Sequence, residues 1–309
     1  MFFDAPPSPL QLLEHSELVG MPIWIKRDDL LHPIVSGNKF RKLKYPLLRI
    51  AQQLDSPSPP TLVTMGGMWS NHLHATAFAA QAFGYQSIGL IRGDSGVNSA
   101  TLDDCRQQGM QLQFVDRTSY RRLRTEPLFW QQLLPDFSCR LQQFHWLPEG
   151  GSDPDALRGV AEIVGELELQ QPKLPDVIMV ACGTAATLAG LLAGLKGRST
   201  VVGVAVLKNA EYLRGEVTRL LKHAGYPDYQ NYQLLTDFHH GGYAKSSFAL
   251  QQFCLQFCEQ SAIMIEPVYT GKVFYALREL VKSGYFAPQT SIAVIHTGGL
   301  QGARGSLRV

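Results

Sequence analysis

The feature that most restricts the fold is a strand–turn–helix–strand pattern between residues 176 and 207. Asp176 to Ala181 is apolar and rich in β-branched residues, which is typical of a strand buried in a parallel sheet. A glycine-containing turn, Cys182–Thr187, comes next, followed by a small-residue helix, Leu188–Leu195, and an apolar strand, Val201–Leu207. This order predicts a β-α-β unit with parallel strands and a right-handed crossover.

A second unit of the same kind lies earlier in the chain. Thr61–Met65 predicts a buried strand, Gly66–His72 a glycine-rich turn, Leu73–Phe83 a helix and Ser87–Ile91 the next strand. The same alternation predicts further strands and helices at Met21–Lys26, Ser99–Gln107, Gln111–Val115, Asp155–Leu169 and Ser291–Ile295. We therefore expect an α/β protein with two open, twisted parallel-sheet domains. Residues 47–143 would form the smaller domain, and 1–46 together with 144–309 the larger.

A lysine motif at residues 36–42, Ser-Gly-Asn-Lys-Phe-Arg-Lys, precedes a helical run. Asn38 is a strong N-cap type, so we expect Lys39 in the first helical turn and Pro46 to kink or end the helix. The positive end of the helix dipole, together with Arg41 and Lys42, would lower the pKa of the Lys39 amine. A partly neutral amine can attack an aldehyde. The alternative is a solvated basic helix start.

Composition excludes several classes of protein. The 309 residues carry a net charge of +2, so no electrostatic field for nucleic acid or an anionic membrane is expected. Five scattered cysteines without a Cys-x-x-Cys pair favour free thiols in a reducing, cytoplasmic compartment and argue against disulfides or a zinc site. The first residues show no signal peptide pattern. The uncharged run 177–195 is interrupted by glycine and threonine, so we interpret it as strand, loop and helix, not as a membrane span.

Two stretches, Lys26–Leu30 and Ser36–Leu43, resemble the start of the 1-aminocyclopropane-1-carboxylate (ACC) deaminase and D-cysteine desulfhydrase family. These are pyridoxal-phosphate (PLP) enzymes of fold type II, which is tryptophan synthase β-like. The resemblance implies that PLP is the cofactor, that Lys39 carries it, and that it lies in the cleft between the domains. It also implies a homodimer and a small amino acid as substrate.

The glycine-rich turn at residues 66–72, Gly-Gly-x-x-Ser-Asn-His, is similar to the family segment that meets the substrate. The resemblance implies that Ser70, Asn71 and His72 contact the substrate and that Asn71 also contacts the cofactor's phenolic oxygen. Leu73 and His74 would lie at the pocket rim. The alternative is that the segment is simply a tight turn followed by a helix cap.

The turn after the strand 176–181 is a candidate phosphate site. Small residues at a helix start expose backbone N–H groups that can hold a phosphate, and the segment lacks the Gly-Lys-Ser/Thr of a nucleotide P-loop. By resemblance, the cofactor phosphate is bound by Gly183, Thr184, Ala185, Ala186 and Thr187. Ala185 stands where many relatives have glycine. The segment Leu147–Ser152 resembles the family's return from the small domain to the large one.

Two C-terminal motifs extend the resemblance. Glu266–Lys272 is similar to the family's Asp-Pro-Val-Tyr-x-Gly-Lys, which implies that Tyr269 faces the substrate and takes part in catalysis. His296–Gly299 resembles the desulfhydrase branch and implies that Thr297 lies at the pyridine nitrogen. Paired His239 and His240 suggest metal, but no ligand set accompanies them, so we expect a glycine loop near the active site and no metal.

The resemblance implies a deaminating lyase. We expect β-elimination from D-cysteine to pyruvate, ammonia and sulfide, with Lys39, Ser70 and Tyr269 as catalytic residues. ACC is the alternative substrate, but Val294 and Ile295 stand where ACC deaminases usually carry a tyrosine. Two other possibilities are a PLP-holding protein without turnover and a sugar- or nucleotide-phosphate binder that uses only the Gly183 turn.

Overall fold

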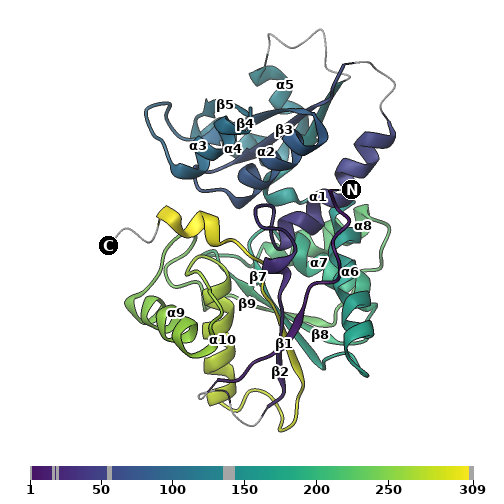
Figure 1. Ribbon diagram of the computed structural model, residues 1–309, viewed down its shortest axis with the longest axis vertical. Coiled ribbons are helices and arrows are strands. Elements are labelled where there is room, and N and C mark those ends of the chain that lie inside the picture. Colours follow the sequence, from purple (N-terminus) through teal and green to yellow (C-terminus); the bar gives the residue numbers. More distant parts are fainter. Residues whose placement is uncertain (1, 16–17, 19–20, 54–57, 135–142, 306–309) are drawn as a thin grey trace.

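The computed structural model contains two β-sheets with helices on both faces (Figure 1). It describes residues 2–15, 18, 21–53, 58–134 and 143–305, so one of the five cysteines, Cys139, lies outside the described residues. The larger sheet has the strand order β1-β2-β10-β7-β8-β9 and the smaller sheet the order β5-β4-β3-β6. All described pairings are parallel except that of β1 with β2.

The strands are β1 Leu10–Leu12, β2 Ile23–Lys26, β3 Thr61–Gly66, β4 Gln86–Arg92, β5 Gln111–Val115, β6 Phe144–Leu147, β7 Val177–Cys182, β8 Thr200–Ala205, β9 Tyr232–Leu235 and β10 Ile292–Ile295. The α-helices are α1 Asn38–Gln52, α2 Asn71–Phe83, α3 Ala100–Gln107, α4 Arg117–Thr125, α5 Trp130–Leu133, α6 Ala156–Gln170, α7 Ala186–Leu195, α8 Leu213–His223, α9 Phe248–Ser261 and α10 Thr270–Lys282. Short 3-10 turns are η2 Asp28–Leu30, η3 Pro127–Phe129, η5 Glu149–Gly151 and η6 Leu300–Gly305.

Two apolar cores enclose the larger sheet. Side chains of α6, α7 and α8 pack on one face of β7 and β8, and side chains of α9 and α10 pack on the other. Alternate strand residues supply the two cores, as the two-residue period of a strand requires: Ile178 and Val180 face the first core, and Met179 and Ala181 face the second. Because both faces are covered, β7 reads as a continuous apolar run, as the sequence predicts.

The smaller sheet, in the upper part of Figure 1, is also covered on both faces. Leu62 packs with α1 and α2, whereas Val63 and Met65 pack with α4 and α5. Strand β6 pairs with β3 in this sheet. The expected boundaries of the smaller domain, 47–143, stay a prediction. Helix α1 begins before residue 47, and β6 of the smaller sheet comes after residue 143.

The expected cap residue of α1 is wrong, and so is the expected end of the helix at Pro46, whereas a kink at Pro46 stays a prediction. Gly37, not Asn38, precedes the helix as its cap residue, with φ 64° and ψ −144°. A Cβ at Gly37 would lie 1.9 Å from the Thr297 carbonyl oxygen, so only glycine allows this approach. The helix also continues through Pro46 to Gln52. Pro46 removes one backbone donor, but the burial of Leu43, Leu47 and Ile50 holds the helix on both sides of it.

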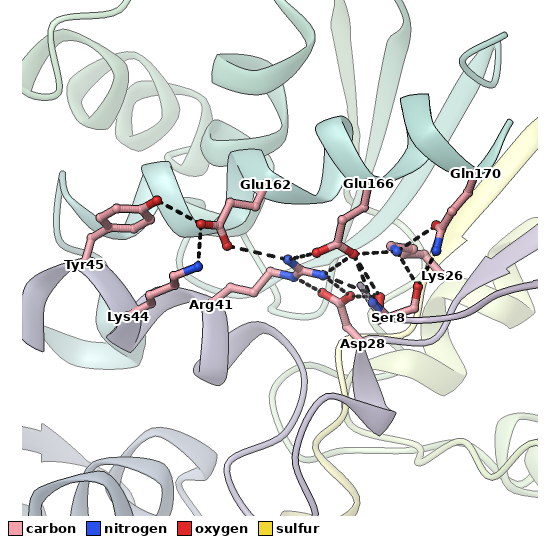
Figure 2. A network of polar contacts seen from close by, with 9 residues as sticks. All are labelled: Ser8, Lys26, Asp28, Arg41, Lys44, Tyr45, Glu162, Glu166 and Gln170. Carbon is pink, nitrogen blue, oxygen red and sulfur yellow. Dashed lines mark hydrogen bonds and ion pairs between the residues drawn. The ribbon is translucent and has the colours of Figure 1, made fainter. Parts of the chain in front are cut away.

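A buried polar network fixes α1 against the larger domain (Figure 2). The Arg41 guanidinium donates to both Asp28 oxygens, at 2.7 Å each, and to both Glu166 oxygens, at 2.8 and 2.9 Å. Lys26 also pairs with Glu166, at 2.6 Å. A Cβ at Gly159 of α6 would lie 2.0 Å from the Arg41 carbonyl oxygen, so the two helices touch through their backbones. This contact places Lys39, two residues before Arg41.

Within the described residues, every helix is too short or too polar to cross a membrane.

Candidate active site

The site lies where turns from four parts of the chain meet at the carboxyl ends of the strands. The Asn38 backbone N–H donates to the Thr297 carbonyl, at 3.2 Å, and the Asn38 side-chain amide donates to Thr187 Oγ1, at 3.0 Å. A Cβ at Gly299 would lie 3.1 Å from Asn71 Nδ2. The start of α1 therefore meets the turns after β7 and β10, and the turn after β3 meets the one after β10. This is where open parallel sheets place ligands.

Lys39 lies in the first turn of α1, as predicted. Its Nζ contacts Asn38 Oδ1 at 3.1 Å and forms no ion pair with a carboxylate of the described chain. Burial lowers the pKa of Lys39 to about 8. The shift has the expected direction, and its cause is desolvation by burial, whereas the charge of Arg41 is paired with Asp28 and Glu166. Near neutral pH an appreciable share of the amine is unprotonated and can act as a nucleophile.

A second lysine, Lys42, is buried one turn further along α1. Its side chain is 2% exposed, and Nζ donates to the Gly150 carbonyl at 3.2 Å. Burial, followed by the charge of Lys39, lowers the pKa of Lys42 well below its ordinary value. Among the described residues this amine has no paired carboxylate, so an anionic group that binds beside it would fit the site.

His72 lies close to the same two amines. The side chain is 1% exposed, and neither ring nitrogen makes a hydrogen bond of normal geometry within the described residues. Burial and then the charges of Lys39 and Lys42 lower the pKa of His72, against a smaller opposite effect of the Pro148 backbone. A buried ring whose nitrogens make no hydrogen bond of normal geometry within the described chain fits a site that receives a polar ligand.

The predicted phosphate turn joins β7 to α7. Ala185 precedes the helix in the left-handed region, with φ 62°, which explains why glycine suits this position. The Ala186 N–H donates to the Thr184 carbonyl at 2.8 Å and closes the turn. A Cβ at Gly150 would lie 2.9 Å from the Thr184 side chain, so the turn contacts the same glycine as Lys42. The turn and the buried amine together form a cradle that fits a phosphate.

The turn after β3 begins α2. Ser70 is the N-cap, and its Oγ accepts from the Leu73 N–H at 3.2 Å. Asn71 Oδ1 accepts from the Gly302 N–H at 3.2 Å and from the Gln301 side-chain amide. Leu73 is fully buried in an apolar cluster of the smaller domain, so its expected place at the pocket rim is wrong. Its burial follows from the helical period, which points it at β4.

His74 is also buried and not free to contact a ligand. Its Nε2 lies 3.1 Å from Asp104 Oδ2, and the same oxygen accepts from Arg304 at 2.5 Å. Asp104 belongs to α3 and Arg304 to η6, so this group connects the C-terminal turn with the smaller domain.

Tyr269 lies beside the phosphate turn. A Cβ at Gly183 would lie 3.4 Å from its ring. Its hydroxyl donates to the Tyr243 hydroxyl at 3.2 Å, and burial and the neighbouring phenol raise the pKa of Tyr269 well above the ordinary value. Glu266 accepts from the backbone N–H groups of Val268, Tyr269 and Thr270, at 2.6, 2.9 and 2.7 Å. The motif therefore fixes the backbone of Tyr269.

Tyr243 was missed in the sequence, although its loop was expected near the site. The loop has a positive φ at four consecutive or near-consecutive residues, His240, Gly241, Gly242 and Ala244. Buried Lys272 donates to the Gly242 carbonyl at 2.8 Å and holds the loop against α10. The only sequence signal for Tyr243 is its position directly after Gly241-Gly242. His240 Nδ1 lies 2.9 Å from the Ser247 hydroxyl, and His239 Nδ1 accepts from the Gly241 N–H at 3.0 Å, within the loop itself.

Thr297 follows β10, and its carbonyl oxygen accepts the hydrogen bond from the Asn38 backbone N–H described above. The preceding His296 ring contacts the Met264 carbonyl at 2.7 Å. Val294 and Ile295 are almost fully buried in the sheet, so neither adds a polar group to the site. Of the residues predicted for the site, Lys39, Asn71, His72, Tyr269, Thr297 and the turn 183–187 are linked by the contacts above.

Comparison with known proteins shows the family of the chain. Residues 3–298 match the family model described as "Pyridoxal-phosphate dependent enzyme". The chain is 31% identical over 303 residues to a putative ACC deaminase of Pyrococcus horikoshii, covering 96% of this chain and 90% of the relative. It is 30% identical over 306 residues to a mitochondrial bifunctional D-cysteine desulfhydrase/ACC deaminase of Arabidopsis thaliana, covering 92% and 73%.

Solved structures agree. A crystal structure of an ACC deaminase homologue superposes with a TM-score of 0.83 at 30% identity, covering 96% of this chain and 90% of that one. A threonine deaminase matches with a TM-score of 0.63 at 17% identity over 96% and 93%, which concerns the fold alone. The two-domain parallel-sheet fold and the PLP cofactor expected from the sequence are thereby confirmed. The chain belongs to the family of pyridoxal-phosphate dependent enzymes.

Proposed function

We propose that this enzyme is a deaminating lyase that prefers D-cysteine, or a similar amino acid with a leaving group on Cβ, over ACC. The observation that carries the proposal is the neutral Thr297 at the end of β10, after the buried aliphatic pair Val294–Ile295. A hydroxyl near the pyridine nitrogen would not hold that nitrogen protonated as a carboxylate would. This favours loss of a β-substituent over transamination.

In this proposal the cofactor occupies the cradle described above. Lys39 carries it covalently, the turn 183–187 holds the phosphate, and Lys42, whose protonated form a neighbouring phosphate favours, supplies a positive charge toward it. Asn71 bonds the phenolic oxygen, and Thr297 lies at the pyridine nitrogen. When bound, PLP withdraws electrons from the α-carbon of the substrate.

The protein's own groups then decide which bond breaks. Once the amine of the substrate has taken its place, the free Lys39 amine, with a pKa of about 8, is suited to take the Cα proton near neutral pH. Ser70, Asn71 and His72 line the substrate side, together with Tyr269. The Tyr269 hydroxyl donates to Tyr243, so the pair presents one fixed hydrogen-bonded unit to the substrate. Sulfide is a good leaving group and needs little further help.

A second candidate function, ACC deaminase, is favoured by that tyrosine pair. ACC has no Cα proton, so its ring must be opened by a nucleophile or by removal of a proton from a ring carbon. Tyr243 adds a third hydroxyl to those of Ser70 and Tyr269 and is hydrogen-bonded to Tyr269. The relatives from Pyrococcus horikoshii and Arabidopsis thaliana carry this activity in their names.

The test is an α-keto acid release assay on the PLP-loaded enzyme with D-cysteine, β-chloro-D-alanine, D-serine, their L-forms and ACC. We expect kcat/KM for pyruvate formation from D-cysteine to exceed kcat/KM for α-ketobutyrate formation from ACC by about 10²-fold or more, the usual effect of one missing acid–base group. A higher value with ACC would contradict the proposed role of Thr297 and Val294–Ile295. The homodimer implied by the resemblance stays a prediction for measurement of the mass in solution.

A further inference from the structure

The C-terminal turn η6 crosses from the end of β10 to the smaller domain and contacts Asn71. Asn71 Oδ1 accepts from the Gln301 side-chain amide and from the Gly302 backbone N–H, the latter at 3.2 Å. A Cβ at Gly302 would lie 2.8 Å from Asn71 Oδ1. The close approach therefore requires glycine at position 302. Gln301 and Gly302 both donate to the Asn71 oxygen, although they lie 230 and 231 positions from Asn71 in the chain.

These contacts determine which way the Asn71 amide points. A backbone N–H can only donate, so the Asn71 atom that faces Gly302 must be its oxygen. The nitrogen, Nδ2, then lies on the other side of the side chain, where a Cβ at Gly299 would be 3.1 Å from it. Asn71 consequently presents a donor, and not an acceptor, toward the turn after β10.

The orientation of Gln301 is determined in the same way. Its Oε1 accepts from the Thr101 hydroxyl at 2.9 Å and from the Arg304 guanidinium at 3.1 Å. A guanidinium has no acceptor, so Oε1 must face Arg304 and Nε2 must face Asn71. The hydrogen bonds are therefore donated in one direction, from Arg304 to Gln301 and from Gln301 to Asn71.

We propose that Gln301 is a positioning residue that, together with Gly302, holds Asn71 with its Nδ2–H directed toward the ring oxygen of the cofactor. The inference rests on the proposed role of Asn71 at that oxygen. Gln301 itself touches neither cofactor nor substrate in this proposal. The smaller domain's contribution to the cofactor site is thereby oriented by η6.

Two variants test the donor. Gln301→Met keeps a similar length and removes all polar atoms, whereas Gln301→Glu places an acceptor oxygen against Asn71 Oδ1. Cofactor affinity is measured by titrating the apoprotein with PLP and following tryptophan fluorescence and the visible absorption band. We expect Kd to rise about 3- to 10-fold for Gln301→Met, as for one lost hydrogen bond, and more for Gln301→Glu.

The matched control is Asp104→Asn. It weakens the ion pair between α3 and Arg304 but touches neither Gln301 nor Asn71. We expect its Kd and visible band to match those of the unmodified protein. An equal rise in Kd for Asp104→Asn would mean that general attachment of η6 matters and not the orientation of Asn71, and would overturn the inference.

Asn71→Ala separates the inference from the proposed function. Asn71→Ala should raise Kd, and Gln301→Met should add nothing in that background, because its effect acts through Asn71. If Asn71→Ala raises Kd but neither Gln301 variant does, Gln301 has no positioning role while the role of Asn71 stands. If Asn71→Ala leaves Kd and the band unchanged, the assigned role of Asn71 is wrong, and the inference is overturned with it.

Discussion

Replacing Arg41 by methionine should destabilise the protein by about 3 kcal/mol. Arg41 is 2% exposed and bonds Asp28, whose side chain is 1% exposed, and Glu166, at 15%. Removing one partner of a buried ion pair costs ~3–5 kcal/mol because the other charge stays buried and unpaired. The lower end applies here, since Glu166 keeps Lys26 at 2.6 Å and Asp28 keeps the Ser8 hydroxyl at 2.6 Å.

The assay is urea unfolding followed by circular dichroism at neutral pH and a constant excess of PLP. Arg122→Met is the matched control, because Arg122 and Glu126 form an exposed pair, 44% and 53% exposed, worth at most about 0.5 kcal/mol. The double variant Arg41→Met with Asp28→Asn should recover part of the loss by removing the unpaired charge. A cost below about 1 kcal/mol for Arg41→Met would refute the reasoning that the network in Figure 2 holds α1 in place.

Three further predictions concern the cofactor site. Lys42→Met should weaken PLP binding about tenfold or more, because it removes the buried amine beside the phosphate turn. The control is Lys44→Met, which removes a partly exposed pair with Glu162 and should not weaken PLP binding. Equal Kd values for the two variants would contradict the role of Lys42. Thr187→Ala should weaken retention by about 1 kcal/mol through loss of the Asn38 contact at 3.0 Å, measured by dialysis, and unchanged retention would show that the contact is dispensable. The rate at which apoprotein takes up PLP should rise with pH up to about 8 and then level off, because the Lys39 amine loses its proton there; a rate that is flat between pH 6 and 9 would contradict that pKa.

Much of the fold was predictable because its signals are local. The apolar run of β7, the turn after it and the small residues of α7 all lie within 19 residues, Val177–Leu195. The expected strand Gln111–Val115 matches β5 in full. The end expected at Pro46 was wrong because the loss of one donor is a local cost, whereas burial of Leu47 and Ile50 is a tertiary gain that the sequence does not display.

The site was predictable only where family motifs mark it. Lys39 and the turn 183–187 stand in such motifs, and the structure brings them together. Tyr243, Lys42 and Gln301 were not identified, because their relevance depends on contacts between distant parts of the chain. Gln301 and Asn71 are 230 residues apart, and no local sequence pattern around Gln301 predicts the contact. The Asn38 cap was wrong for the same reason, since only the approach of Thr297 requires glycine before the helix.

The central claim, that Lys39 carries the cofactor, is tested most directly by reducing the PLP-loaded protein with borohydride and mapping its peptides by mass spectrometry. We predict a single pyridoxyl-phosphate label on Lys39, whose amine has a pKa of about 8 and no carboxylate partner in the described chain. Lys42 and Lys272 serve as internal comparisons, since both are buried amines with lowered pKa values. A label on either of them, with Lys39 unmodified, would contradict the account.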